Sequence, residues 1–259
     1  MKLEYVSYTC NDRIGIIQLC RPEKRNALNS EFINQLSKVF TNASNDKNCK
    51  IIILKSEGSV FCAGADLKYL QQIQKNSFEE NNTDSRQLMS LFYQIYKCSK
   101  LTIAQIQGHA IAGGCGLASV CDLSFSSPSS KFGYTEVKIG FAPAIVSVFL
   151  LQKIGETKAK ELLLTGKLIT ADEAEKIGLI NKVVAHDELE SFTLKYAQDL
   201  CNNISEQSVK ITKELISEIQ NLSMKDGLEK AVLMNASSRE HKDFQKGISS
   251  FLKNEKIIW

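Results

Sequence analysis

Apolar side chains in the first part of the chain switch between the spacing of strands and the spacing of helices. Residues 3–9 alternate, 11–13 carry turn-forming residues, and 15–19 are again apolar and β-branched, which predicts a β-hairpin. Residues 30–40 place apolar side chains at helical intervals behind a capping Asn or Ser, and 51–54 form a short apolar run typical of a buried strand. The chain therefore begins with a hairpin, a helix and a buried strand.

Two strand-to-helix corners follow. The first passes from an apolar run through Ala63-Gly64-Ala65 to Asp66, which is well placed near a helix N-terminus. The second passes from a strand at 101–107 through Gly108 to Gly114 and into a helix that ends near residue 121. Further strands are expected at 123–126 and 132–133. Strands that alternate with helices predict an α/β core with largely parallel pairing.

The remaining segments are mostly helical in pattern. Residues 71–87 are polar and weakly periodic, so we expect a mobile excursion that could serve as a lid, followed by a helix at 88–98. Past Pro143 the expected elements are helices at 145–154, 158–164 and 171–177, the last ended by Gly178, and an apolar run at 180–184. From Leu189 onward the pattern predicts three helices and no strand. We therefore divide the chain into a core at 1–190 and a helical region at 191–259.

Composition narrows the class of protein. The chain has 259 residues, of which 43% are hydrophobic and 24% charged, which is typical of a globular protein without a membrane span. A net charge of +3 gives little support to nucleic-acid binding but is compatible with small phosphate-bearing ligands. The eight cysteines show no CxxC spacing, so neither a metal site nor a disulfide framework is expected. With no signal or transit pattern at residues 1–15, we expect a cytoplasmic location.

The two corners have a chemical and a structural interpretation. Each would present unpaired backbone N–H groups at a helix start, and two such groups aimed at one point form an oxyanion hole. Loss of one donor from such a hole typically costs about 2.7–4 kcal/mol of transition-state stabilisation. Alternatively, the glycines only allow tight turns and close packing. Periodicity alone favours this structural explanation.

Glu136 lies among apolar neighbours between Phe132-Gly133 and the loop that ends at Pro143. Partial desolvation there would raise its pKa towards the range in which one carboxyl group accepts and donates a proton at neutral pH. The alternative is a surface glutamate paired with Lys138. The dinucleotide, P-loop and nucleophile-elbow motifs are absent. We expect a structural role for His109 and a backbone-bonding role for Asp122.

Five segments together resemble the enoyl-CoA hydratase/isomerase, or crotonase, superfamily, in the family's order and across essentially the whole chain: RPEKRNALN, FCAGADL, AGGCGLASVCDLSF, FGYTEVKIGFAPA and GISSFLKNEKIIW. The resemblance implies a core built as a spiral of ββα units that binds acyl-CoA thioesters. It also implies a C-terminal helical region that assembles a homotrimer or a hexamer. No cofactor is implied, because CoA is part of the substrate, and neither a metal, a membrane nor a nucleic-acid partner is expected.

The resemblance also implies roles for particular residues. Ala65 and Gly113 would donate their N–H groups to the thioester carbonyl, and Glu136 would move the proton. The chemistry would be stabilisation of a thioester enolate. Gly116 and Pro143 would line the substrate pocket. The CoA-binding positions would be Lys24, Arg25, Ala27, Ala63, Asp66 and Leu67, with Lys24 or Arg25 near the phosphates.

One position departs from the two-glutamate hydratases of the family. They carry a first catalytic glutamate where this chain has Gly116. The segments around Gly116 and Glu136 look like those of bacterial methylglutaconyl-CoA hydratases, which also lack that glutamate, so hydration of such an enoyl-CoA is our first expectation. A Δ3,Δ2-enoyl-CoA isomerase with Glu136 as its single base is the alternative. A non-catalytic acyl-CoA-binding subunit is the alternative from another class.

Overall fold

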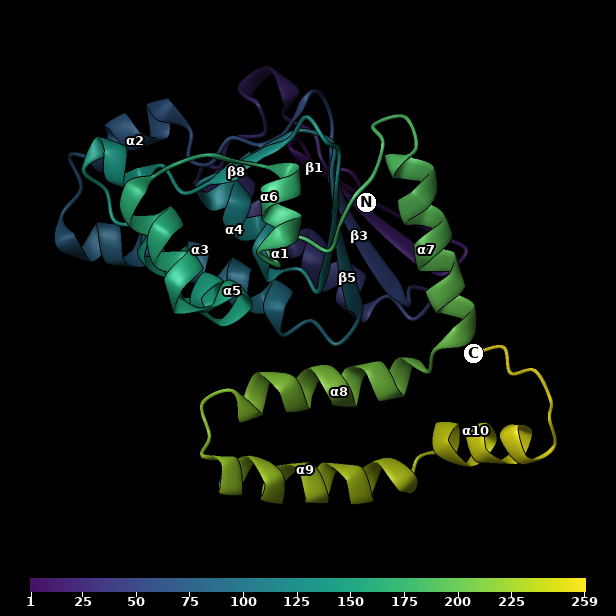
Figure 1. Ribbon diagram of the computed structural model, residues 1–259. Helices are drawn as coiled ribbons and strands as arrows, with labels where there is room; N and C mark the ends of the chain where they lie inside the picture. Colours follow the sequence, from purple (N-terminus) through teal and green to yellow (C-terminus); the bar gives the residue numbers. More distant parts are fainter.

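The N-terminal hairpin begins a six-stranded sheet that runs through the centre of the protein, as the computed structural model of all 259 residues shows (Figure 1). The order of the strands is β1-β2-β3-β5-β7-β10, and every pair after the antiparallel hairpin is parallel. The strands of this sheet are β1 (Val6–Asn11), β2 (Ile14–Leu19), β3 (Ile51–Ser56), β5 (Leu101–Ile106), β7 (Leu123–Ser126) and β10 (Lys182–Val183).

A second, four-stranded sheet is built from short strands, three of which directly follow strands of the first. Its strands are β4 (Val60–Cys62), β6 (His109–Ile111), β8 (Lys131–Gly133) and β9 (Ile169–Thr170). β4, β6 and β8 are parallel, and β9 closes the sheet antiparallel to β8. The chain thus repeats one unit three times, a strand in each sheet followed by a helix. This repetition confirms the ββα core.

The helices of the core cover the sheets. They are α1 (Ser30–Asn45), α2 (Leu67–Ile73), α3 (Phe78–Tyr96), α4 (Gly113–Val120), α5 (Ala144–Thr165) and α6 (Ala171–Lys176), with 3-10 turns η1 (Pro22–Lys24) and η2 (Glu136–Ile139). Asn29 begins α1 as expected, because its side chain accepts a hydrogen bond from Phe32 N. The two helices predicted at 145–154 and 158–164 form α5, which is interrupted at Gly155, where φ is 73°.

The prediction of a mobile excursion at 71–87 is wrong. α2 ends at Ile73, a short turn follows, and α3 starts at Phe78 and runs through the segment. Ser77 and Glu80 form a capping box, in which each side chain accepts a hydrogen bond from the backbone N–H of the other. The helix remains polar because only Leu91, Phe92 and Ile95 near its end are buried.

Two hydrophobic clusters lie on opposite faces of the large sheet. β3 shows this directly, because Ile52 and Leu54 belong to the larger cluster whereas Ile51 and Ile53 belong to the smaller one. Alternate side chains of a strand point to opposite faces, so β3 is buried on both. The smaller cluster is covered by α7 (Leu189–Asn203), which packs on β2, β5 and β7. The division of the chain at residue 190 stays a prediction.

Four helices, not three, follow residue 189. After α7 come α8 (Glu206–Ile219), α9 (Met224–Arg239) and α10 (Lys242–Leu252). The break before α10 escaped the sequence pattern because no Gly or Pro marks it, and His241 Nδ1 accepts a hydrogen bond from Asp243 N at the new helix start. These last three helices contain no buried residue and extend away from the sheets (Figure 1). None of the helices has the combination of length and hydrophobicity that crossing a bilayer requires.

Candidate active site

The segments that follow β4, β6 and β8 meet at one edge of the small sheet. The three strands are parallel neighbours, so their C-terminal ends lie side by side. Gly64, after β4, has φ of +87°, and a Cβ on it would stand 2.8 Å from the Cβ of Ala112 and 3.6 Å from Gly113 N. Ala112 N donates to Gly133 O at 2.8 Å, which joins the β6 corner to the end of β8. The two corners expected from the sequence are therefore in contact.

Both corners present a free amide at this edge. Ala65 is exposed, and its N–H donates no hydrogen bond within the chain. Gly113 is the first residue of α4, so its N–H has no intrahelical acceptor. Ala112, just before it, has φ of 51° and ψ of −124°. A non-glycine residue in such a conformation stores about 1–3 kcal/mol of strain, a feature often found at functional sites.

Close packing accounts for the second glycine of the pair. A Cβ on Gly114 would stand 2.2 Å from Cys62 O, whereas a Cβ on Gly113 would meet only Leu28 Cδ1 at 3.4 Å. Gly114 thus lets α4 lie directly against the end of β4. The structural explanation of the glycine pair holds for Gly114, and the free amide of Gly113 fits the chemical one.

Glu136 begins η2, three residues after β8, and is half-buried. Its Oε2 atom is buried and has no hydrogen-bond partner, and no ion pair joins the carboxylate to Lys138. Desolvation raises the pKa of this carboxyl group above its ordinary value, and the residue's own backbone N–H opposes the shift in part. The alternative of a paired surface glutamate is wrong, and the desolvated carboxylate is present as expected.

The space beside Gly116 is occupied by hydrocarbon. A Cβ on Gly116 would stand 2.6 Å from Val146 Cγ1 and 2.7 Å from Phe92 Cε2. Phe92 comes from α3 and Val146 from α5, and both are buried. A larger side chain at Gly116 would have to displace both. This position of α4 therefore offers neither a polar group nor room for one.

Tyr134, which sequence reasoning missed, lies between β8 and Glu136. The residue is fully buried, and its hydroxyl has no hydrogen-bond partner of normal geometry although the Cys115 thiol and the Ser119 hydroxyl are close. Burial raises the pKa of the phenol well above its ordinary value, so it stays protonated. The alternation around residue 132 could have signalled a buried tyrosine here, but its missing partner is visible only in three dimensions.

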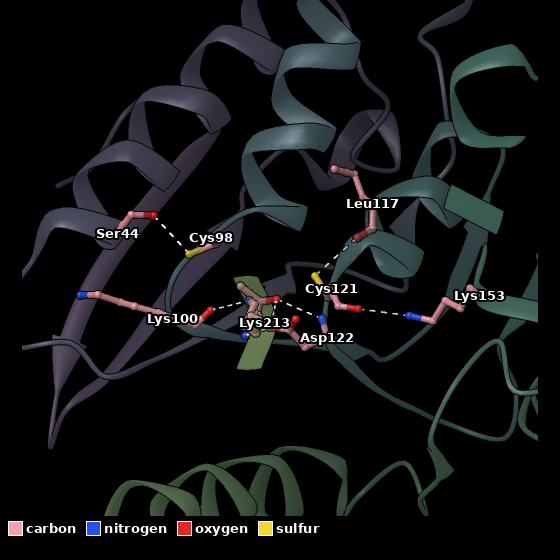
Figure 2. Close-up of polar contacts among 9 residues, drawn as sticks. Ser44, Cys98, Lys100, Leu117, Cys121, Asp122, Lys153 and Lys213 are labelled. Atoms are coloured by element: carbon pink, nitrogen blue, oxygen red, sulfur yellow. Dashed lines mark hydrogen bonds and ion pairs between the residues drawn. The ribbon is translucent and has the colours of Figure 1, made fainter. Parts of the chain in front are cut away.

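The C-terminal end of α4 is held by two lysines from other helices (Figure 2). Lys153 of α5 donates to Ser119 O at 2.9 Å and to Cys121 O at 3.1 Å. Lys213 of α8 contacts Asp122 Oδ2 at 2.5 Å. A cation near the C-terminus of a helix complements the helix dipole, so Lys153 stabilises α4 at the end opposite the free amide. Burial lowers the pKa of the Lys153 ammonium group.

Asp122 and His109 have structural partners. Asp122 accepts from Thr102 N at 2.7 Å and from Thr102 Oγ1 at 2.8 Å, so it bonds the backbone of a neighbouring strand in addition to Lys213. His109 is exposed, and its Nδ1 accepts from Lys131 N at 3.2 Å, which links β6 to β8. No group of three or more His, Cys, Asp or Glu side chains is placed to hold a metal ion.

The expected CoA-binding residues belong to the β4 corner and to the segment 24–27, which is hydrogen-bonded to that corner. Lys24 and Arg25 are exposed, and neither side chain makes an ion pair or hydrogen bond, so both cations are available to a phosphate. Asp66 is 7% exposed, and its carboxylate already pairs with Arg21 and caps α2 through Lys68 N. The remaining CoA-binding positions are Ala27, which is buried, Ala63, which is half-buried, and Leu67, which is 78% exposed. Pro143, expected in the substrate pocket, is half-buried.

The repeated ββα units bring two free amides and a desolvated carboxylate to one edge. Free amides can stabilise charge on a carbonyl oxygen, and a desolvated carboxylate can move a proton, so together they suit an enzyme site. The chain belongs to the enoyl-CoA hydratase/isomerase family, whose sequence profile matches residues 9–259. A Thermus thermophilus protein, provisionally named an enoyl-CoA hydratase, is 38% identical over 240 residues, covering 93% of this chain and 94% of that protein.

Two further comparisons agree with the family. A mitochondrial Δ(3,5)-Δ(2,4)-dienoyl-CoA isomerase of Dictyostelium discoideum is 30% identical over 270 residues, covering 99% of this chain and 91% of its own length. The crystal structure of an enoyl-CoA hydratase from Shewanella pealeana superposes with a TM-score of 0.94 at 27% identity, covering 100% of this chain and 97% of that one. The protein is therefore an enzyme of this family, with the crotonase fold.

Proposed function

We propose that the protein adds water to an enoyl-CoA thioester, with Glu136 as its only acid–base group and with a short branched chain of the methylglutaconyl type as substrate. The observation that carries the proposal is the buried, unpartnered Oε2 of Glu136 at the edge where the amides of Ala65 and Gly113 are free. The name given to the Thermus relative supports hydration.

The reaction needs one carboxylate that takes a proton and returns it. Water gives a proton to Glu136 as its oxygen bonds to C3, and the electrons of the double bond move onto the thioester oxygen. The N–H groups of Ala65 and Gly113 stabilise the enolate that results. Glu136 then returns the proton to C2 as the carbonyl re-forms, so that H and OH have been added. Each bond change is accounted for without a cofactor.

The same site supports a second candidate reaction. The hydrocarbon of Phe92 and Val146 beside Gly116 leaves this position of α4 without a polar group that could hold the water, which favours proton transfer within the substrate. In a Δ3,Δ2-enoyl-CoA isomerase, Glu136 would take a proton from C2 of a 3-enoyl thioester. It would return that proton to C4, leaving the double bond between C2 and C3. The dienoyl-CoA isomerase among the relatives supports this alternative.

A panel of three substrates separates the two reactions. Methylglutaconyl-CoA, crotonyl-CoA and a 3-enoyl-CoA are each incubated with the enzyme in water labelled with heavy oxygen. Hydration puts the label into the product, whereas isomerisation moves the double bond without it. Label in the methylglutaconyl product supports our first proposal, and migration without label on the 3-enoyl substrate supports the second.

The variant Glu136→Gln tests the common step. We expect turnover to fall at least about 100-fold, the usual scale of acid–base catalysis, while affinity for a CoA thioester is retained. Glu188→Gln is the matched control, because Glu188 is exposed just before α7 and its side chain makes no hydrogen bond at the helix start. Unchanged turnover in Glu136→Gln would remove this residue from the mechanism.

We further propose a homotrimer or a hexamer assembled through the last helices and working in the cytoplasm. Met224, Leu228 and Val232 form a stripe along α9 and are 81%, 60% and 62% exposed in the single chain. All eight cysteines are free, which suits a reducing compartment. Leu228→Glu should lower the mass measured by light scattering, and Glu229→Lys, just outside the stripe, should leave it unchanged. A single-chain mass for the unmodified protein would contradict this assembly.

A further inference from the structure

The backbone on both sides of Ala65 is bonded to the segment 25–28. Leu28 N donates to Gly64 O at 2.7 Å, and Asp66 N donates to Leu28 O at 2.8 Å. Ala63 N donates to Arg25 O at 3.0 Å. These bonds leave the N–H of Ala65 as the free donor between two fixed neighbours. Its direction therefore depends on where residues 25–28 are held.

The buried side chain of Arg21 connects the segment 25–28 to the loop that carries Ala65. It is 8% exposed, its Nη2 lies 2.9 Å from Asp66 Oδ2, and its Nη1 donates to Ala27 O at 2.9 Å. The guanidinium group also lies over the ring of Tyr5, 5.0 Å from its centre. One buried cation thus contacts residues that directly follow Ala65 and directly precede Leu28.

Asn26 holds the same segment to the sheet. It is fully buried, and its Nδ2 donates to Glu57 O and to Val60 O, each at 2.9 Å. Its Oδ1 accepts from Arg21 N at 2.9 Å. Asn26 also has φ of 53°, a left-handed conformation that asparagine tolerates better than most residues. The segment is therefore fixed to the β3–β4 connection as well as to the loop that carries Ala65.

We propose that the buried ion pair of Arg21 and Asp66, braced by Asn26, positions the Ala65 N–H for the thioester oxygen. This inference rests on the proposed role of Ala65. The polar atoms of all three side chains are bonded to other groups of the protein. The three residues therefore act on the reaction only by positioning the Ala65 N–H. A site of this kind requires its groups to lie within about 0.5 Å of the productive geometry. Arg supports it well because its planar fork reaches two acceptors at once.

The test combines turnover with the carbonyl stretch of a bound thioester. Asp66→Asn keeps the size of the side chain and an acceptor for Lys68 N but removes the charge opposite Arg21. We expect kcat to fall by about 10- to 100-fold, with KM within about threefold, because a displaced donor weakens the transition state more than ground-state binding. The infrared band of bound butyryl-CoA, labelled at the carbonyl, should move back towards the frequency of the free thioester.

Two variants separate positioning from a loss of stability. Leu189→Ala removes a buried side chain from the far face of the large sheet, so it should lower Tm while leaving kcat and the carbonyl band unchanged. Arg21→Lys keeps the cation but reaches only one acceptor, so it should fold and show a partial shift of the band with a partial loss of kcat. Asp66→Asn and Arg21→Lys would overturn the inference if both lowered Tm but kept the wild-type band and kcat.

Failure of the underlying proposal has a different signature. If the carbonyl band of butyryl-CoA bound to the unmodified enzyme matches that of the free thioester, Ala65 is not an oxyanion donor. A shifted band in the unmodified enzyme that survives in both variants leaves the donor in place and refutes only the role of Arg21 and Asp66. Loss of the shift in both variants supports both statements.

Discussion

Two adjacent glycines should respond very differently to the same substitution, Gly114 with a loss of stability and Gly113 with little change. In Gly114→Ala the new methyl carbon would stand 2.2 Å from Cys62 O and 2.7 Å from the carbonyl carbon of Cys62. To restore an ordinary separation of about 3.5 Å, α4 and the end of β4 would have to move apart by about 1.3 Å. Since the contact is with backbone, no side-chain rotation can relieve it.

The size of this displacement sets the expected effects. Overpacking of this kind typically costs about 1–3 kcal/mol of unfolding free energy. The helix that moves begins at Gly113, so the shift also carries the candidate donor away from the thioester. A misplacement of about 1 Å can lower catalysis by about 100-fold, and we expect a loss of kcat on that scale.

Gly113→Ala is the matched control for stability. Its Cβ would meet only Leu28 Cδ1, at 3.4 Å, so unfolding free energy should change by less than about 1 kcal/mol. Urea denaturation of the three proteins gives the free energies, and initial rates on an enoyl-CoA give kcat for Gly114→Ala. If Gly114→Ala matched the unmodified enzyme in both measurements, the contact between α4 and Cys62 could not be a rigid one, and the reasoning would be refuted.

Three further results are expected. Because burial raises the pKa of Glu136, the folded state keeps its proton to a higher pH than the unfolded chain, so stability falls as pH rises from about 4.5 through the folded pKa. Thermal unfolding should show Glu136→Gln more stable than the unmodified protein above that window and equal to it below; a gap at every pH would contradict the assignment. Gly116→Glu should lose at least about 1–3 kcal/mol in urea denaturation, because it displaces Phe92; a neutral result would mean that the space can open. Lys213→Met leaves Asp122 without its cation, so amide exchange in α8 should accelerate, and unchanged protection would show that the ion pair does not hold the helix.

Much of the core could be predicted because its strands and helices obey simple periods. The apolar run at β3 is continuous because both faces of the sheet are covered, and the helix that starts at Ser30 carries its cap in the preceding residue. The start of α3 was not predicted as a helix, because only the end of that helix is buried and its first turns show no apolar period. Its capping box, Ser77 with Glu80, is a local signal that could have corrected the error.

The site was predictable only in part. Glu136 and the two corners are visible as sequence features, and the resemblance to the family supplied their possible roles. Their meeting at one edge depends on parallel pairing between β4, β6 and β8, which no local pattern specifies. The ion pair of Arg21 with Asp66 joins residues far apart in the chain. Its recognition requires knowledge of burial, because an exposed pair of the same residues would carry little energy.

The left-handed backbone of Ala112 limits how far this enzyme can be made heat-resistant without harm. Glycine adopts positive φ without penalty, so Ala112→Gly removes strain from the folded protein. It also raises the conformational entropy of the unfolded chain, which opposes folding. The two effects oppose each other, so relief of strain at Ala112 brings little net gain in the free energy of unfolding. Because Ala112 directly precedes Gly113, the same change would also give the Gly113 amide more freedom, so we expect Ala112→Gly to lower kcat with little gain in melting temperature. Higher thermal stability should therefore come from residues remote from this turn.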